Sequence, residues 1–119
     1  MKIYISHSRD FNFKTDLYQP LQDSKLSLKH AFFFPHEVER STHTQKEIQD
    51  SDLVLAEVSY PSTGQGIELG WANASQVPIV CVSKEGSSVS GSLQYITKDF
   101  IVYTDSEDLI LELTQFLDK

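Results

Sequence analysis

The fold is decided by the stretch from Asp52 to Trp71, which reads DLVLAEVSYPSTGQGIELGW. Residues 53–56 and Val58 form an apolar run that is too short for a helix, so the run predicts a strand covered on both faces, as in a parallel sheet. A loop rich in serine and glycine follows, and the apolar spacing from Ile67 onward predicts a helix packed on that sheet. Free backbone N–H groups and the positive end of a helix dipole then lie at the carboxyl edge of the sheet, where open α/β sheets bind ligands.

Short strand and helix patterns alternate along the rest of the chain. Strands are expected at residues 2–6, 30–34, 53–58, 77–83 and 100–103. Helices are expected at residues 13–21, 44–51, from 67 onward, 92–96 and 106–117, and Pro20 should end or bend the first of them. The alternation predicts one flavodoxin-like (Rossmann-like) α/β domain, with a five-stranded parallel sheet of order 2-1-3-4-5 and helices on both faces. In that order the loops at residues 4–10 and 59–68 wall one crevice.

Length, charge and cysteine content limit the class of protein. The 119 residues leave room for one domain, residues 1–119, and the fractions of hydrophobic (39%) and charged (23%) residues are ordinary for a soluble globular chain. A formal net charge of −7 argues against a nucleic acid polymer as partner, because duplex binding needs a basic face. No apolar stretch is long enough to span a membrane, and the single cysteine, Cys81, fits a reducing compartment. We therefore expect a cytoplasmic protein without a membrane partner.

The most informative side chain of the predicted crevice is Glu68, about one turn into the expected helix and shortly after Gly64 and Gly66. The helix dipole should favour the ionised carboxylate, which suits a nucleophile or an electrostatic stabiliser. The two glycines allow a ligand to approach the backbone closely. The alternative is a first-turn glutamate that only complements the dipole.

Residues 56–70, AEVSYPSTGQGIELG, resemble the signature of the nucleoside 2-deoxyribosyltransferase superfamily, especially of its 2'-deoxynucleoside 5'-monophosphate N-glycosidase branch. The resemblance implies that Glu68 attacks C1' of the sugar and forms a covalent glycosyl-enzyme, and that Ser62 binds the 5'-phosphate. It also implies that Tyr4, on the facing strand, orients Glu68 through a hydrogen bond. For Tyr4, packing under the first helix is an equal alternative.

The same resemblance implies further contacts with a 5'-phosphate. Ser8 falls at a phosphate-binding serine of the family, and Ser92 falls at a serine that reaches the site of the neighbouring subunit. The resemblance therefore implies a homodimer with shared active sites. The family's phosphate-binding arginine falls at Asp10 in this chain, and Arg9 is one residue away and could substitute.

One position departs from the family pattern. The family's base-contacting aspartate falls at Thr44, whose hydroxyl cannot act as a proton-donating acid. Glu47, one helical turn further on, or His43 could take over that contact. The departure also supports a different class of function, an inactive relative that senses a nucleotide or pairs with another protein.

The resemblance therefore implies an N-glycosidase or deoxyribosyltransferase acting on nucleosides or their 5'-monophosphates. Hydrolysis is favoured over base transfer because Ser8, Ser62 and Ser92 fit a phosphate better than a bare 5'-hydroxyl. A second enzyme reading rests on residues 3–10, IYISHSRD, which resemble the first strand of TIR domains that cleave NAD with a glutamate. No cofactor is expected, and the four histidines lack the spacing of a metal site.

Overall fold

The computed structural model describes residues 1–37 and 44–118 of the chain. Five strands form one parallel sheet of order β2-β1-β3-β4-β5. The strands are β1 (Lys2–His7), β2 (Ala31–Phe33), β3 (Leu53–Glu57), β4 (Ile79–Lys84) and β5 (Asp99–Tyr103). The predicted flavodoxin-like sheet and its strand order are therefore confirmed.

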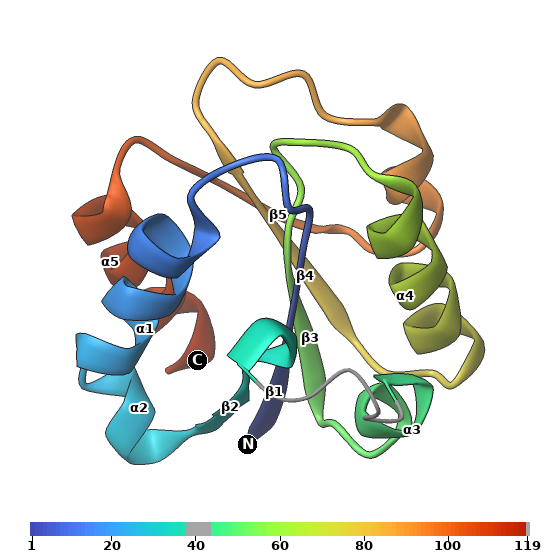
Figure 1. The fold of residues 1–119 in the computed structure, drawn as a ribbon, viewed down its shortest axis with the longest axis horizontal. Helices are drawn as coiled ribbons and strands as arrows, with labels where there is room; N and C mark the ends of the chain where they lie inside the picture. Colours follow the sequence, from blue (N-terminus) through green and yellow to red (C-terminus); the bar gives the residue numbers. More distant parts are fainter. Residues whose placement is uncertain (38–43, 119) are drawn as a thin grey trace.

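Helices cover both faces of the sheet, as Figure 1 shows. One layer comprises α1 (Gln19–Asp23), α2 (Leu26–Lys29) and α5 (Ser106–Leu117), and the other comprises α3 (Thr44–Gln49) and α4 (Thr63–Ala74). Alternate strand residues build two cores, because successive side chains of a strand point to opposite faces. Ile5 and Leu55 belong to the core under the first layer, whereas Tyr4 and Ala56 belong to the core under the second. Every residue of β3 is buried, as expected for a strand covered on both faces.

Helix α4 begins at Thr63, earlier than the apolar spacing predicted. The reason is Ser62, whose hydroxyl caps the helix by accepting a hydrogen bond from the Gln65 backbone N–H (3.3 Å). The cap offsets the weak helix propensity of the two glycines, which therefore lie in the opening turn of the helix and not in a loop. Glu68 consequently lies in the second turn.

The first helical segment differs from the single helix predicted at residues 13–21. A π-helical turn, η1 (Lys14–Tyr18), runs into α1, and Pro20 sits in the first turn of α1 and not at its end. Proline is tolerated in a first turn because the backbone N–H groups there need no partner within the helix. Helix α2 and the 3-10 turn η2 (Pro35–Glu37) lie outside the predicted elements, and the helix predicted at residues 92–96 is the 3-10 turn η3 (Gly91–Tyr95).

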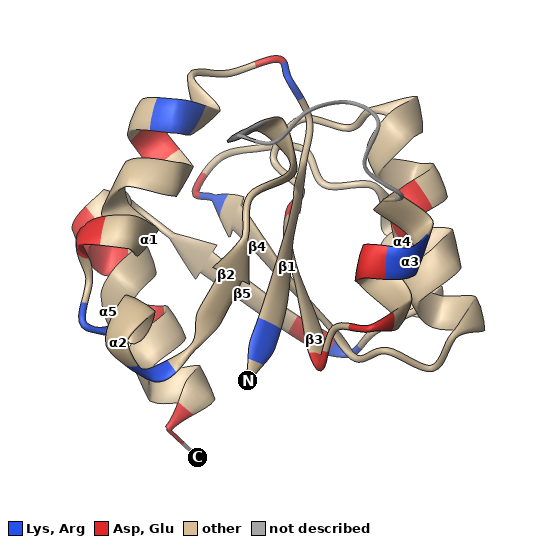
Figure 2. Cartoon of the chain, turned by 60° about the horizontal axis from the view of Figure 1, so that its bottom comes forward, with Lys and Arg blue, Asp and Glu red and all other residues tan. Residues whose placement is uncertain are grey.

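Charged side chains lie mainly on the outside of the fold. Figure 2 shows Lys, Arg, Asp and Glu on the helices and near the strand ends. Within residues 1–37 and 44–118, no helix is long and apolar enough to cross a membrane. Glu57, at the end of β3, is an exception to the outward placement of charge, because it is only 1% exposed.

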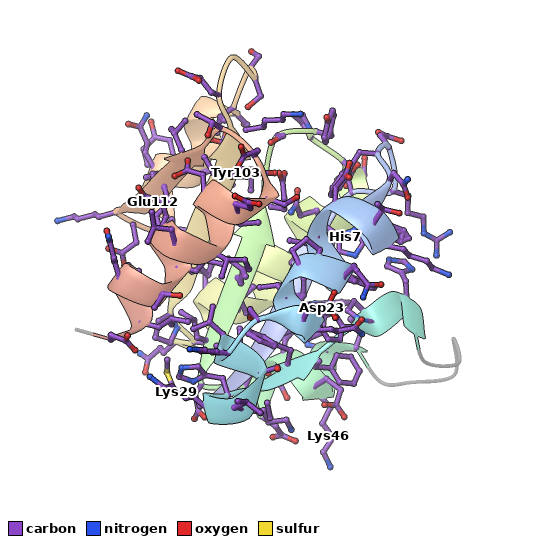
Figure 3. All side chains as sticks on the ribbon, turned by 90° about the vertical axis from the view of Figure 1, so that its left-hand side faces the viewer. His7, Asp23, Lys29, Lys46, Tyr103 and Glu112 are labelled. Atoms are coloured by element: carbon purple, nitrogen blue, oxygen red, sulfur yellow. The ribbon has the colours of Figure 1, made fainter. Side chains whose placement is uncertain are left out.

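The Glu57 carboxylate ties the loop after β3 to the far edge of the sheet. Its oxygens accept hydrogen bonds from the Ser59 N–H (2.7 Å), from the Ser59 hydroxyl (2.9 Å) and from the phenol of Tyr103 on β5 (Figure 3). The Ser59 hydroxyl oxygen in turn accepts a hydrogen bond from the Lys84 N–H of β4 (2.7 Å). Buried carboxylates are tolerated when donors satisfy them, so this network fixes the loop that leads into α4.

Replacing Tyr103 with phenylalanine should lower the free energy of unfolding by about 1–3 kcal/mol, because the buried Glu57 carboxylate loses a donor while the ring stays. Urea unfolding of both proteins measures the difference. Tyr95→Phe is the matched control, because Tyr95 is 83% exposed. A Tyr103→Phe loss no larger than that of the control would show that the phenol contributes nothing to stability.

Candidate active site

A cavity of about 460 Å³ lies at the carboxyl ends of β1 and β3, where the strand order predicts a crevice. It is lined by His7, Ser8, Arg9, Asp10, His36, Thr44, Ser62, Gly64, Gln65, Glu68 and Trp71. The cavity thus brings together residues that are distant in sequence. Among them are the predicted site residues Ser8, Arg9, Thr44, Ser62, Gly64 and Glu68.

Glu68 borders the cavity from α4 and is held by two donors of β1. The Tyr4 phenol donates a hydrogen bond to Oε2 of Glu68, and the Ser6 hydroxyl donates one to Oε1 (3.0 Å). Tyr4 and Ser6 are both fully buried, and their two-residue spacing places them on the same face of the strand. Ser6 was missed by the sequence analysis, and this spacing from Tyr4 is the signal that points to it. Each carboxylate oxygen therefore has its own donor.

The electrostatics of Glu68 differ from the sequence prediction. Burial raises the pKa of Glu68 above its ordinary value, and the hydrogen bonds from Tyr4 and Ser6 oppose that rise. The predicted net shift toward the ionised form is wrong, because Glu68 lies in the second turn, where the dipole effect has faded, and its carboxylate is desolvated. Burial and the nearby Glu68 charge also raise the pKa of Tyr4, so the phenol keeps its proton and remains a donor.

The loop after β1 supplies polar groups to the facing wall of the cavity. The Ser8 hydroxyl oxygen accepts a hydrogen bond from the Asp10 N–H (2.8 Å), which tightens the loop and accompanies the burial of Ser8 (2% exposed). The Arg9 guanidinium donates a hydrogen bond to Nδ1 of His36 (3.4 Å) on η2. Arg9 and Asp10 both line the cavity, so this wall carries one positive and one negative side chain.

His7, at the end of β1, is a buried neutral histidine (Figure 3). Its Nδ1 is 2.6 Å from the Ser8 carbonyl oxygen, so Nδ1–H is the donor there, and Nε2 accepts a hydrogen bond from the Tyr18 phenol (2.6 Å). Burial lowers the pKa of His7 from 6.5 to about 4, and the positive charge of Arg9 acts in the same direction. His7 therefore supports the cavity wall as an uncharged ring.

The lowered pKa of His7 predicts a pH-dependent stability. In the unfolded state His7 is protonated below pH 6.5, whereas in the folded state it is protonated only below about pH 4. The stabilisation is therefore fully present above pH 6.5 and is lost as the pH falls toward 4. The loss should be on the order of 3 kcal/mol. Urea unfolding of the wild type and of His7→Gln across this range isolates the effect, because other titrations are common to both. Parallel curves would contradict it.

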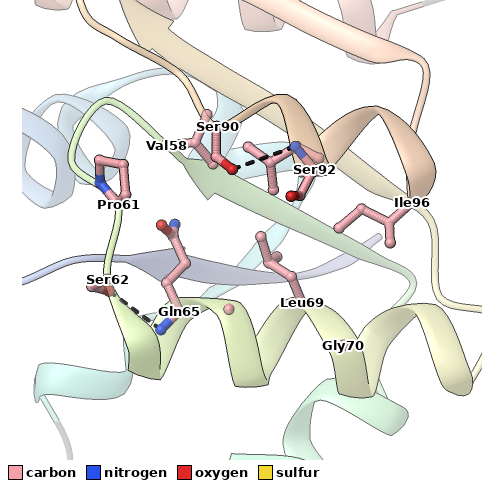
Figure 4. A pocket seen from close by; sticks show the side chains of 11 residues that line it. Val58, Pro61, Ser62, Gln65, Leu69, Gly70, Ser90, Ser92 and Ile96 are labelled. Atoms are coloured by element: carbon pink, nitrogen blue, oxygen red, sulfur yellow. Dashed lines mark hydrogen bonds between the residues drawn. The ribbon is translucent and has the colours of Figure 1, made fainter.

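Three of the predicted substrate-binding residues do not line this cavity. Gly66 and Ser92 line a second cavity of about 290 Å³ between α4 and η3 (Figure 4). The Glu47 carboxylate is 3.6 Å from Nζ of Lys2, at the amino end of β1. His43, the other residue that could take over the contact with the base, lies outside the described residues.

The glycines of α4 leave empty space beside the helix. A Cβ added at Gly64 or Gly66 would meet no atom of the described chain within 4 Å. Gly64 borders the larger cavity, and a side chain there would occupy part of it. In the described part of the chain, no group of three or more His, Cys, Asp or Glu residues could hold a metal ion.

Gln65 is a second functional residue that the sequence analysis missed. Its side-chain N–H groups donate hydrogen bonds to the backbone carbonyl oxygens of Glu57 (2.7 Å) and Ser6 (3.2 Å). The amide thus joins the first turn of α4 to the ends of β1 and β3. No local pattern signals this role, because both acceptors are backbone atoms brought close only by the fold.

The arrangement offers a specific kind of chemistry. The Glu68 carboxylate borders a cavity large enough for a small molecule, and its orientation is fixed from behind by Tyr4 and Ser6. A carboxylate placed in this way can stabilise or attack an electron-poor carbon. The N-terminal turn of α4 and Arg9, from the facing wall, both supply positive potential to the cavity.

Sequence comparison finds local matches to two curated proteins. Over 46 residues the chain is 44% identical to a Methanococcoides burtonii protein named "Putative 2'-deoxynucleoside 5'-phosphate N-hydrolase 1", and the match covers 39% of this chain and 38% of that protein. A protein of the same name from Syntrophotalea carbinolica is 42% identical over 48 residues, which are 40% of this chain and 32% of that protein. The match therefore spans less than half of either relative. No family model matches the chain.

Solved structures share the fold over most of the chain. The CMP N-glycosidase of Clostridium botulinum superposes with a TM-score of 0.68 at 19% identity, over 96% of this chain and 99% of that one. A 2-deoxyribosyltransferase of Bacillus psychrosaccharolyticus superposes with a TM-score of 0.65 at 22% identity, over 92% and 90% of the two chains. At these identities the likeness establishes the fold alone. The chain therefore has the fold of these enzymes, and over less than half of its length its sequence is similar to the two proteins named as 2'-deoxynucleoside 5'-phosphate N-hydrolases.

Proposed function

We propose that this chain cleaves the N-glycosidic bond of nucleosides or deoxynucleosides, or of their 5'-monophosphates, with water favoured over a second base as the acceptor. The observation that carries the proposal is the half-buried Glu68 carboxylate, held at one oxygen by Tyr4 and at the other by Ser6, beside a cavity of about 460 Å³. That cavity lies at the edge of the sheet where ligands of this fold class bind.

The proposed reaction has two displacements at C1'. A Glu68 oxygen forms a bond to C1' while the bond from C1' to the base nitrogen breaks and the base leaves with the electron pair. Water then attacks C1', the Glu68 carboxylate leaves, and the proton released from water balances the proton gained by the base. The negative charge of Glu68 stabilises the oxocarbenium-like transition state of both steps.

Recognition of a 5'-phosphate is supported by groups from both walls of the cavity. Ser8 and Ser62 supply hydroxyls, Arg9 supplies a positive charge, and Gly64 leaves the backbone of the first turn of α4 accessible. The names of the two curated relatives refer to a 5'-phosphate, and one structural neighbour is a CMP N-glycosidase. We therefore favour monophosphates over nucleosides as substrates.

Thr44, and not Glu47, is placed to contact the base. Thr44 lines the cavity from the first residue of α3, and its hydroxyl can hydrogen-bond to a base without acting as an acid. The Glu47 carboxylate is engaged with Lys2 instead. Trp71, which lines the same cavity from α4, offers an aromatic edge or face to a bound base.

We also propose a homodimer with shared sites, as the family resemblance implies, and the position of Ser92 supports it, because Ser92 lines the second cavity of its own chain and not the cavity that Glu68 borders. Mixing Glu68→Ala with Ser92→Ala chains tests this. Each mixed dimer would then contain one site with both residues intact. Activity of the mixture above that of Ser92→Ala alone supports sharing, and strictly additive activity contradicts it.

The proposed reaction is tested by incubating the protein with deoxynucleoside and nucleoside 5'-monophosphates, with the corresponding nucleosides and with NAD, and by measuring released base chromatographically. Free base from monophosphates is the expected result, and a second base added to the mixture reports transfer as a new nucleotide. Release of nicotinamide would favour a TIR-like activity instead. Binding of nucleotides without turnover would favour an inactive sensing module.

A further inference from the structure

The Glu68 carboxylate accepts hydrogen bonds from two donors, and of these the Ser6 hydroxyl is the one that the family resemblance does not name. Ser6 is 0% exposed, and its hydroxyl donates to Oε1 of Glu68 at 3.0 Å, whereas the Tyr4 phenol donates to Oε2. A carboxylate held at a single oxygen can rotate about its last side-chain bond, because that torsion has a broad energy profile. A donor on each oxygen fixes the plane of the carboxylate.

Gln65 fixes the strand end that carries Ser6. Its amide donates one hydrogen to the Ser6 carbonyl oxygen (3.2 Å) and the other to the Glu57 carbonyl oxygen (2.7 Å), at the ends of the neighbouring strands β1 and β3. Both hydrogens of the amide are used, so its orientation is determined. Gln65 and Glu68 are three residues apart on α4, so the helix contacts β1 at two successive points, one turn apart.

We propose that Ser6 is a positioning residue for the Glu68 nucleophile. Gln65 fixes the backbone of Ser6, so that the Ser6 hydroxyl stays within hydrogen-bond distance of Glu68. This inference rests on the proposed function. When one Glu68 oxygen bonds to C1', the other becomes the carbonyl oxygen of a glycosyl ester and keeps its donor. When water attacks C1', the ester C1'–O bond breaks and the carboxylate that leaves is stabilised by the same donors. Ser6 therefore acts in both displacements.

Other charged and titratable groups around Glu68 also influence its pKa, so the effect of Ser6 must be separated from theirs. Tyr4 contacts Glu68 directly, and the cavity wall also carries His7, Arg9, Asp10 and His36. All five stay in place when only the Ser6 hydroxyl is removed, so a change in the titration of Glu68 isolates that hydroxyl. Without this donor the half-buried Glu68 carboxylate should ionise at higher pH, because a hydrogen bond to the charged form is lost.

The test compares Ser6→Ala with the wild type and with Ser51→Ala. Ser51 is the matched control, because it is also buried and its hydroxyl donates to a backbone carbonyl oxygen, that of Glu47, away from the cavity. Ser6→Ala should lower kcat roughly ten- to hundredfold with KM within about threefold, and should move the acidic limb of the kcat/KM profile to higher pH. Ser51→Ala should leave both unchanged.

Two further variants sharpen the result. Ser6→Cys keeps nearly the same shape with a weaker donor, so its kcat should lie between those of the wild type and Ser6→Ala. Gln65→Met keeps the side-chain length without the two donors and should lower kcat in the same direction, with an effect that is not additive with Ser6→Ala. Equal kcat in the wild type, Ser6→Ala and Ser6→Cys, with an unshifted profile, would overturn the proposal.

A second readout separates this inference from the proposed function. If the wild type releases no base from any substrate, the proposed function fails, and the Glu68 titration is then followed directly by carbon NMR of labelled glutamate side chains. The Glu68 signal is assigned by its absence in Glu68→Gln. A titration midpoint at higher pH in Ser6→Ala supports the positioning role, and an unchanged midpoint excludes it.

Discussion

Replacing Glu68 with glutamine should lower kcat for base release by roughly four orders of magnitude or more, because the amide can neither form the glycosyl ester nor stabilise positive charge at C1'. The side chain keeps its shape, and the Tyr4 and Ser6 hydroxyls can still bond to it. The thermal midpoint should be unchanged or higher, because a partly desolvated carboxylate is replaced by a neutral amide of the same shape. Loss of activity therefore cannot be ascribed to unfolding.

The covalent step has its own measurement. Incubation with a slow fluorinated substrate analogue should add the mass of one glycosyl group to the wild type, and peptide mapping should place it on Glu68. The same incubation should leave Glu68→Gln unmodified. Base release that persists in Glu68→Gln at the wild-type rate would show that another group is the nucleophile.

Replacing Tyr4 with phenylalanine should lower kcat by roughly a hundredfold, because Oε2 of Glu68 loses its donor. The ring itself should stay in place, since it stacks on Phe33 with centroids 5.5 Å apart. KM should change little, because the phenol is buried behind the carboxylate and not among the residues that line the cavity. Steady-state kinetics on purified variants measure both constants.

The matched control for Tyr4→Phe is Tyr103→Phe. Tyr103 is also a buried tyrosine whose phenol donates to a buried carboxylate, but that carboxylate is Glu57 on the opposite face of the sheet. Tyr103→Phe should lower stability while leaving kcat within about threefold. If Tyr4→Phe behaves in the same way, Tyr4 is a packing residue and Glu68 needs no phenol.

The sheet could be predicted because each strand has a recognisable pattern within a short stretch of the sequence. The buried run that precedes Glu57 reads as a strand from its length and apolar content alone, and the alternation of strands with helices restricts the topology. The start of α4 could not be predicted by the same means. The capping hydrogen bond of Ser62 outweighs the low helix propensity of Gly64 and Gly66. Whether a serine forms such a cap depends on which local conformation its side chain stabilises, and the apolar spacing carries no information on this.

By itself the sequence determined the strand order, the edge at which the cavity opens and the carboxylate, Glu68, that borders it, because periodicity, turn residues and a short motif are local properties. Only the tertiary structure decided that Ser6 and Gln65 support that carboxylate, that burial raises its pKa, and that Ser92 lies in a different cavity. Ser6 and Glu68 are 62 positions apart, and their contact depends on how β1, β3 and α4 pack together. Contacts and desolvation of this kind arise from packing, which no local pattern encodes.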